Sequence, residues 1–274
     1  MCDLHGCGRH RAMPPIVVPD AQRRAFLKGL ASLPLAAVLF DPSLAQAQAS
    51  TLEDVEIKVE GAEPLRGAIA VPDAETGPAV LLIHEWWGLN DQIKAVAAEF
   101  AKLGFVAFAI DLFDTEPAAD PDAAMQLVQN LDKEAATAKL VAAIGWLAAY
   151  ERSTGKVATI GWCFGGGWSL DASLATPVDA TVIYYGNVEK TAAQLESLYG
   201  PVLGHFAIQD KFITKDMVDR FEKAMAEAGK SEFLTVYWYD ADHAFANPSG
   251  ARYDASDAKL AWDRTLEFLR AGLA

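Results

Sequence analysis

The hydrophobic and polar positions of the chain change period repeatedly along the sequence. Residues 55–59 alternate apolar and charged side chains, which predicts a half-buried strand, and residues 65–71 are its predicted partner. Residues 79–84 form a continuous apolar run, which is typical of a strand covered on both faces. Residues 91–103 carry apolar side chains at helical spacing, and Gly104 ends the predicted helix.

The same alternation continues to the end of the chain. Strands that alternate with helices of ten or more residues indicate an α/β fold with a mostly parallel sheet and helices on both faces. No internal repeat or long linker follows residue 50, so we expect one domain over residues 50–274. The further expected strands are 105–110, 157–160, 178–185, 201–208 and 233–239, and the further helices are 120–150 with at most one break, 214–227 and 255–270.

Composition narrows the class of protein. The chain has 274 residues, of which 52% are hydrophobic, so it can bury a large core and intrinsic disorder is excluded. The 37 acidic residues outnumber the 23 basic ones, which argues against a nucleic-acid partner because phosphate binding needs a basic surface. No cysteine or histidine cluster with zinc-ligand spacing occurs in the expected domain. We therefore expect neither a metal nor an organic cofactor.

The first 49 residues have the features of an export signal. Arg23 and Arg24 precede Phe-Leu-Lys and a twelve-residue, mostly apolar run over 29–40, which is too short to span a bilayer. Small-x-small cleavage patterns follow over residues 45–49, and the segment resembles a bacterial twin-arginine signal. We expect the export machinery as a partner, a periplasmic or secreted mature protein, and no stable membrane insertion. The alternative is an amphipathic N-terminal helix of the domain, which Pro34 disfavours.

The sequence around Cys163, the cysteine that the expected mature chain retains, carries the sharpest chemical signal. A predicted strand runs into Gly161-Trp162-Cys163-Phe164-Gly165, and a helix is expected to follow. This is the pattern of a nucleophile elbow, in which glycines allow a sharp turn and the nucleophile lies at a helix N-terminus. The helix dipole there favours a thiolate and an oxyanion. The alternative is a glycine-rich turn with a buried structural cysteine.

An elbow predicts an acid and then a histidine later in the chain. Asp210 directly follows the predicted strand 201–208, and His243 lies in a polar loop between the last strand and the last helix. Both positions are at the carboxyl edge of the expected sheet, where catalytic groups gather in such folds. His205 lies inside an apolar strand and is expected to be a core histidine. Asp210 could also be an ordinary turn aspartate.

These motifs, together with His84-Glu85-Trp86-Trp87-Gly88 and Asp242-His243-Ala244-Phe245, resemble the dienelactone hydrolase (carboxymethylenebutenolidase) family over residues 52–272. The resemblance implies an α/β-hydrolase fold and a Cys163-His243-Asp210 triad that forms a cysteine acyl-enzyme on a small ester or lactone. It also implies that Glu85 helps to generate the thiolate and that the backbone amides of Trp86 and Phe164 form an oxyanion hole. Glu85 could instead be a solvated charge, and the tryptophans core or rim aromatics.

The chain departs from the family in the part that binds a substrate carboxylate. The family holds that group with two arginines, one of which would lie four residues after the histidine, where this chain has Asn247. Arg252 is the nearest basic side chain. The other arginine would lie in the loop after residue 111, where this chain has Asp114 and Glu116 instead, and we expect these acidic side chains beside the mouth of the pocket. We therefore expect neutral substrates to be favoured. The expected substrate-binding residues are Trp87, Tyr185, Phe245, Asn247 and Arg252.

The sequence therefore leaves three candidate functions. The first is a dienelactone hydrolase-like enzyme, and the second is a broad esterase or thioesterase for neutral acyl compounds. The third is a non-catalytic exported protein that binds a small ligand among aromatic side chains, although a complete triad argues against a pure binder. We expect a monomer whose partner is a small molecule.

Overall fold

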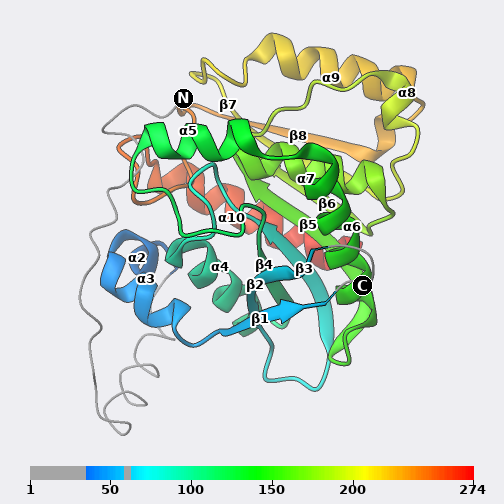
Figure 1. Ribbon diagram of the computed structural model, residues 1–274. Helices are drawn as coiled ribbons and strands as arrows, with labels where there is room; N and C mark the ends of the chain where they lie inside the picture. The colour runs from blue at the N-terminus through cyan, green and yellow to red at the C-terminus, as the bar shows by residue number, and fades with distance from the viewer. Residues whose placement is uncertain (1–34, 59–62) are drawn as a thin grey trace, which may run out of the picture.

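One mixed sheet forms the centre of the molecule (Figure 1). The computed structural model describes residues 35–58 and 63–274. The strand order is β1-β2-β4-β3-β5-β6-β7-β8 in this part of the chain, with β1–β2 and β2–β4 antiparallel and all later pairs parallel. The strands are β1 (Glu53–Ile57), β2 (Leu65–Ala70), β3 (Gly77–Ile83), β4 (Val106–Asp111), β5 (Ser153–Trp162), β6 (Ala180–Tyr184), β7 (Val202–Ala207) and β8 (Leu234–Tyr239).

Helices cover both faces of the sheet, as the sequence predicts for an α/β-hydrolase fold. Helices α4 and α10 pack on one face and α6, α7 and α9 on the other, while α5 lies over the loop that follows β3 (Figure 1). The main helices are α4 (Asp91–Lys102), α5 (Pro121–Asn130), α6 (Lys133–Ala149), α7 (Phe164–Ala175), α9 (Lys215–Glu227) and α10 (Ala255–Gly272), with the short α8 (Ala192–Leu195) and a 3-10 turn (Ser231–Phe233).

The central strand β3 shows how the sheet builds two cores at once. Its side chains alternate between the faces, so Val80 and Leu82 join the core under α4 while Leu81 and Ile83 join the core under α6. All four side chains are fully buried. Full burial of each such side chain contributes about 1.5–3 kcal/mol, which explains the uninterrupted apolar run in the sequence.

Most expected elements are present, with differences at their ends. The predicted helix 120–150 is two helices, because Asp132 caps the start of α6 through hydrogen bonds to the amides of Glu134 and Ala135. Strand β5 begins at Ser153 rather than 157, since it pairs with Gly77 of β3 before it enters the core. The short α8 has no counterpart in the prediction.

Two helices precede the first strand, α2 (Leu35–Phe40) and α3 (Pro42–Ala49), and they lie beside α4 (Figure 1). Val38, Leu39 and Ala45 are buried in the same core as α4. The side-chain amide of Gln48 donates to the carbonyl of Ala95 at 3.3 Å. Cleavage at either predicted signal site would therefore remove packed residues.

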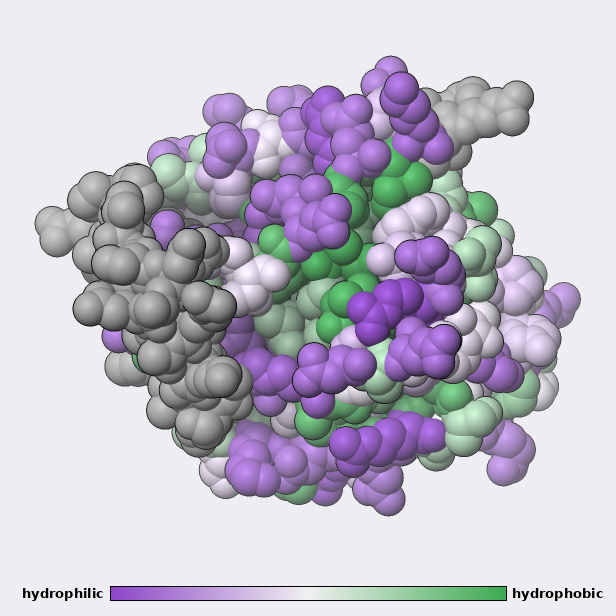
Figure 2. All heavy atoms as spheres, turned by 90° about the horizontal axis from the view of Figure 1, so that it is seen from below, coloured by the Kyte–Doolittle hydropathy of each residue, from purple (hydrophilic) through white to green (hydrophobic). Residues whose placement is uncertain are grey.

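The twin arginine of the predicted export signal lies outside the described residues. Within the part that the structure describes, no helix has the length and apolar character needed to cross a bilayer. Viewed from below, the molecule shows hydrophobic side chains gathered in a central hollow and mostly hydrophilic ones around it (Figure 2).

Candidate active site

Cys163 lies in a sharp turn between β5 and α7. Its φ is 54° and its ψ −113°, a backbone conformation that a residue with a Cβ adopts only when its surroundings enforce it. A Cβ on Gly161 would overlap the carbonyl of Gly165, and a Cβ on Gly165 would overlap the carbonyl of Ile83. Glycine is therefore required at both positions, and the turn has the geometry that the sequence pattern predicts.

The structure brings Cys163 together with His243 and Asp210. Nε2 of His243 lies 3.1 Å from Sγ of Cys163, and Nδ1 lies 2.7 Å from Oδ2 of Asp210. The second oxygen of Asp210 accepts hydrogen bonds from the amides of Phe212 and Ile213, which fix the carboxylate in its turn. Asp210 therefore holds the Nδ1 proton, and Nε2 is left to exchange a proton with the thiol.

The charge state of His243 depends on both neighbours. Burial acts to lower the pKa of His243, but the adjacent Cys163 and the hydrogen bond to Asp210 oppose it, and the pKa rises from 6.5 to about 10. The side chain of His243 is 5% exposed and that of Asp210 is fully buried, so water screens their attraction little. This arrangement favours an imidazolium facing the sulfur, which is the partner that a thiolate needs.

Glu85 follows β3 and is buried close to the elbow. Its Oε2 accepts a hydrogen bond of 2.7 Å from the side-chain amide of Asn247, while Oε1 has no partner in the described chain. Burial raises the pKa of Glu85, and the hydrogen bond from Asn247 and the charges of His243 and Arg252 oppose the rise. Glu85 is therefore not the solvated loop charge of the alternative interpretation.

Arg252 reaches toward the same region from the loop before α10. Its Nε and Nη2 atoms are buried and have no hydrogen-bond partner among residues 35–58 and 63–274. Its charge acts on Glu85, but no ion pair joins the two in this part of the chain. The guanidinium therefore influences the site through its charge rather than through a direct bond.

His84 holds two loops of the site in place, a role that the sequence analysis did not assign. Its Nδ1 donates to the carbonyl of Glu85 at 2.6 Å, and its Nε2 accepts from the amide of Leu112 at 3.1 Å. Complete burial lowers the pKa of His84 from 6.5 to about 4, so the ring is neutral and can both donate and accept. The sequence feature that could have indicated this role is the position of His84 directly after the buried strand β3. His205 is a core histidine, as predicted.

A pocket of about 520 Å³ opens beside Cys163 and His243. Tyr185 is the expected substrate-binding residue that lines it, whereas Phe245 is packed in the core and Asn247 faces Glu85. The sequence analysis missed the apolar walls, because they come from one face each of several helices and loops. These walls are formed by Val128, Leu131, Phe164, Trp168, Phe212 and Ile213.

Trp86 and Trp87 pack together under α5. Their ring centroids are 4.9 Å apart, and both are nearly buried in a small cluster with Ala118 and Ala124. Phe164, whose amide lies in the first turn of α7 and has no intrahelical partner, also packs against this cluster. Trp87 therefore supports the loop after β3 rather than lining the pocket beside Cys163.

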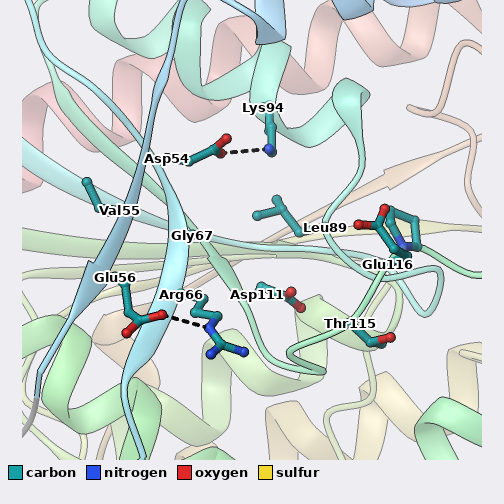
Figure 3. A pocket seen from close by; sticks show the side chains of 11 residues that line it. Asp54, Val55, Glu56, Arg66, Gly67, Leu89, Lys94, Asp111, Thr115 and Glu116 are labelled. Atoms are coloured by element: carbon teal, nitrogen blue, oxygen red, sulfur yellow. Dashed lines mark hydrogen bonds and ion pairs between the residues drawn. The ribbon is translucent and has the colours of Figure 1, made fainter.

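The acidic residues that we expected at the pocket mouth lie elsewhere, and this part of the prediction is wrong. Asp114 forms an ion pair with Lys139. Glu116 lines a second pocket of about 380 Å³ together with β1, β2 and α4 (Figure 3). Figure 3 shows that two ion pairs, Asp54 with Lys94 and Glu56 with Arg66, also face this second pocket. Neither Asp114 nor Glu116 therefore lines the pocket around Cys163.

Pocket charges near Cys163 come from other residues and are mostly paired. Lys190 lies 2.9 Å from Asp171, and Glu189 lies 3.1 Å from Arg220. Apart from His243, the remaining charged side chain in the lining of this pocket is Lys133, which is exposed at the rim. The lining of this pocket contains no arginine.

The chain is similar to known proteins in sequence and in fold. The chain is 34% identical to the protein usf of Aquifex pyrophilus over 228 residues, covering 79% of this chain and 96% of the relative. It is 26% identical to carboxymethylenebutenolidase 1 of Cupriavidus pinatubonensis over 227 residues, with the same coverage of each chain. The solved dienelactone hydrolase of Anabaena variabilis has the same fold, with a TM-score of 0.61, 21% identity and coverage of 81% and 98%.

The family match extends over nearly the whole described domain. Residues 65–273 match the dienelactone hydrolase family, from the start of β2 to the end of α10. This range includes the elbow at Cys163, the acid at Asp210 and the histidine at 243. The chain belongs to the dienelactone hydrolase family.

Proposed function

We propose that this hydrolase cleaves a small ester or lactone through a cysteine acyl-enzyme on Cys163. Membership of the dienelactone hydrolase family makes the protein a hydrolase of ester or lactone bonds. The observation that carries the cysteine mechanism is the continuous chain of contacts from Sγ of Cys163 through His243 to Asp210. A nucleophile, a base and an orienting acid at hydrogen-bond distance are what such a mechanism requires.

Acylation begins with attack of the Cys163 sulfur on the substrate carbonyl carbon. A carbon–sulfur bond forms and the carbonyl oxygen becomes an anion, which the backbone amides of Trp86 and Phe164 would stabilise. The carbon–oxygen bond to the leaving group then breaks, and the leaving oxygen takes a proton from the imidazolium of His243. The charge of His243 acts to lower the pKa of Glu85, so an imidazolium at His243 favours the carboxylate form of Glu85.

Deacylation reverses these roles. Neutral His243 accepts a proton from water, and the resulting hydroxide attacks the thioester carbonyl. The carbon–sulfur bond breaks, the acid is released, and the thiolate is again paired with the imidazolium. Asp210 keeps the ring in one orientation through both halves of the cycle, because its other oxygen is fixed by two backbone amides.

The pocket favours a neutral substrate, either a lactone or a simple ester. Its walls next to Cys163 are apolar, and the lining offers no arginine to a substrate carboxylate. Burying a carboxylate without a cationic partner costs several kcal/mol. A broad esterase for neutral acyl compounds is therefore the second candidate, and it differs from the first in substrate range rather than in mechanism.

Modification of the thiol tests the mechanism. Iodoacetamide should label Cys163 and abolish hydrolysis in the same proportion. Cys163→Ala should remove nearly all turnover while the protein stays folded, and Cys163→Ser should keep at most weak activity. A burst of leaving group equal to the enzyme concentration would exclude a pure ligand-binding protein. Full activity in the alanine variant would end the cysteine mechanism.

We also propose that the precursor is exported by the twin-arginine route. The pair Arg23-Arg24 before an apolar run supports this proposal. Replacing both arginines by lysine should leave the precursor in the cytoplasm, as cell fractionation would show. Processed protein in the periplasm of that double variant would contradict the proposal.

A further inference from the structure

Two adjacent tyrosines at the end of β6 have opposite surroundings. Both side chains are fully buried. The hydroxyl of Tyr184 forms a hydrogen bond of 2.7 Å with Thr265 of α10. The hydroxyl of Tyr185 has no hydrogen-bond partner within the described chain, although a buried hydroxyl without a partner is costly to fold. An unpaired buried hydroxyl calls for an explanation, and a role in catalysis is one that fits its position.

The backbone of Tyr185 is also strained. Its φ is +38°, and the conformation is held by a hydrogen bond of 2.8 Å from its amide to the carbonyl of His205. The strand pairing of Trp162 with Tyr184 brings this residue beside Cys163, which has a positive φ of its own. Backbone strain of this kind persists where the surrounding structure enforces it, and it is concentrated in functional sites.

The side chain of Tyr185 belongs to the pocket around the nucleophile. It lines this pocket together with Cys163 and His243, and its ring meets the His243 ring edge-on, with centroids 5.2 Å apart. Burial, followed by the charges of Glu85 and Cys163, raises the pKa of Tyr185 well above 10. The phenol therefore keeps its proton at every working pH and is available as a hydrogen-bond donor.

We propose that the hydroxyl of Tyr185 donates a hydrogen bond to the leaving-group oxygen of the substrate during acylation. This inference rests on the proposed cysteine mechanism. The carbonyl oxygen is assigned to the amides of Trp86 and Phe164, whereas the leaving oxygen must face His243, which supplies its proton. Tyr185 lies beside His243 in the lining of the same pocket, which makes its hydroxyl the neighbouring donor for an oxygen that faces His243. The carbon–oxygen bond breaks toward that oxygen, and Tyr185 stabilises the developing charge without giving up its own proton.

The variant Tyr185→Phe removes only the hydroxyl and tests this role. The substrates are a series of acetate esters in which the leaving group becomes steadily poorer, from 4-nitrophenyl through phenyl to ethyl. A good leaving group needs no hydrogen bond, so kcat/KM for the 4-nitrophenyl ester should fall at most about twofold. The ethyl ester should lose about tenfold or more in kcat/KM. The dependence of the rate on leaving-group pKa therefore becomes steeper.

Tyr184→Phe is the matched control, because it removes the neighbouring hydroxyl that has a structural partner. It should lower the free energy of unfolding and change all esters by the same factor. Tyr185→Phe should be at least as stable as the wild type, since the removed hydroxyl has no partner in the described structure. A change by one common factor across the ester series, or no change at all, would overturn the role of Tyr185 alone. Wild-type rates in Cys163→Ala would overturn the cysteine mechanism and this inference together.

Discussion

The sulfur of Cys163 and Nε2 of His243 are 3.1 Å apart, although 80 residues separate them in the chain. The elbow between β5 and α7 places the sulfur, and the loop after β8 places the ring. Because the two strands belong to one sheet with a fixed order, the contact is determined by the fold rather than by local sequence. The protonation of His243 consequently depends on its contact with Cys163.

Removal of the sulfur should change the titration of His243. Cys163 is among the groups that raise the pKa of His243 to about 10, while burial acts to lower it. In Cys163→Ala, Asp210 remains to oppose the effect of burial but the contribution of Cys163 is lost. The pKa of His243 should therefore fall by one unit or more. Titration of the ring resonances by NMR measures this change. An equal pKa in both proteins would mean that the thiol and imidazole are not coupled.

The bond between Glu85 and Asn247 should contribute to stability in a pH-dependent way. Asn247→Leu removes the donor and should cost about 1–3 kcal/mol in the free energy of unfolding. Burial already raises the pKa of Glu85, and loss of the donor raises it further, so the cost should be larger at pH 8 than at pH 5. Urea unfolding at both pH values checks this. In a Glu85→Gln background the pH difference should vanish, and its survival would point to another group.

Sequence reasoning predicted which residues of the candidate triad come together better than it predicted the shape of the cavity. Cys163, Asp210 and His243 were identified because residue type, order and position at strand ends all point to them. The position of Glu116 was predicted wrongly, since the path of a loop beyond β4 depends on packing that no local pattern records. Likewise, the sequence analysis selected Tyr185 and not Tyr184 as a substrate-binding residue, but the sequence gives no sign of how their hydroxyls differ. Only the fold shows that the hydroxyl of Tyr184 is paired with Thr265, whereas that of Tyr185 has no partner among the described residues.

Two buried histidines should make the protein sensitive to mild acid. Burial lowers the pKa of His84 to about 4, and burial with the charge of Arg264 lowers the pKa of His205 to about 3. Below pH 6.5 the unfolded chain binds protons at these rings that the folded chain does not, so stability falls as pH decreases. At pH 5 each ring should cost about 2 kcal/mol relative to pH 7. Urea unfolding between pH 7 and 5 should give a shallower slope for His205→Gln, and an unchanged slope would contradict the assignment.

Neutral esters should be better substrates than carboxylate-bearing ones. The pocket around Cys163 has apolar walls and no arginine in its lining. Of its two lysines, Lys190 is paired with Asp171 and Lys133 is exposed at the rim, so a substrate carboxylate buried against the apolar walls would lack a buried cationic partner. We expect kcat/KM for a neutral ester to exceed that of its matched carboxylate by about tenfold or more, equivalent to at least ~1.4 kcal/mol. Arg252→Gln should leave this ratio unchanged. A selective loss of carboxylate turnover in that variant would show that Arg252 holds the substrate anion.

Helices α2 and α3 should stabilise the domain in any form of the protein that retains residues 35–49. Val38 and Leu39 are nearly buried in the core that contains α4, and full burial of each such side chain contributes about 1.5–3 kcal/mol. A chain that starts at Ser50 should therefore unfold about 3 kcal/mol more easily than one that starts at Leu35. Chemical denaturation of the two purified proteins measures the difference.

Point variants separate packing from chain length in this comparison. Val38→Asp places a charge in the core and should destabilise the longer protein about as much as removal of both helices, whereas Ala37→Asp lies on the exposed side of α2 and should change little. If the protein that starts at Ser50 equals the longer one in stability, the packing of α2 and α3 contributes nothing, and removal of residues 1–49 during export would leave the domain intact.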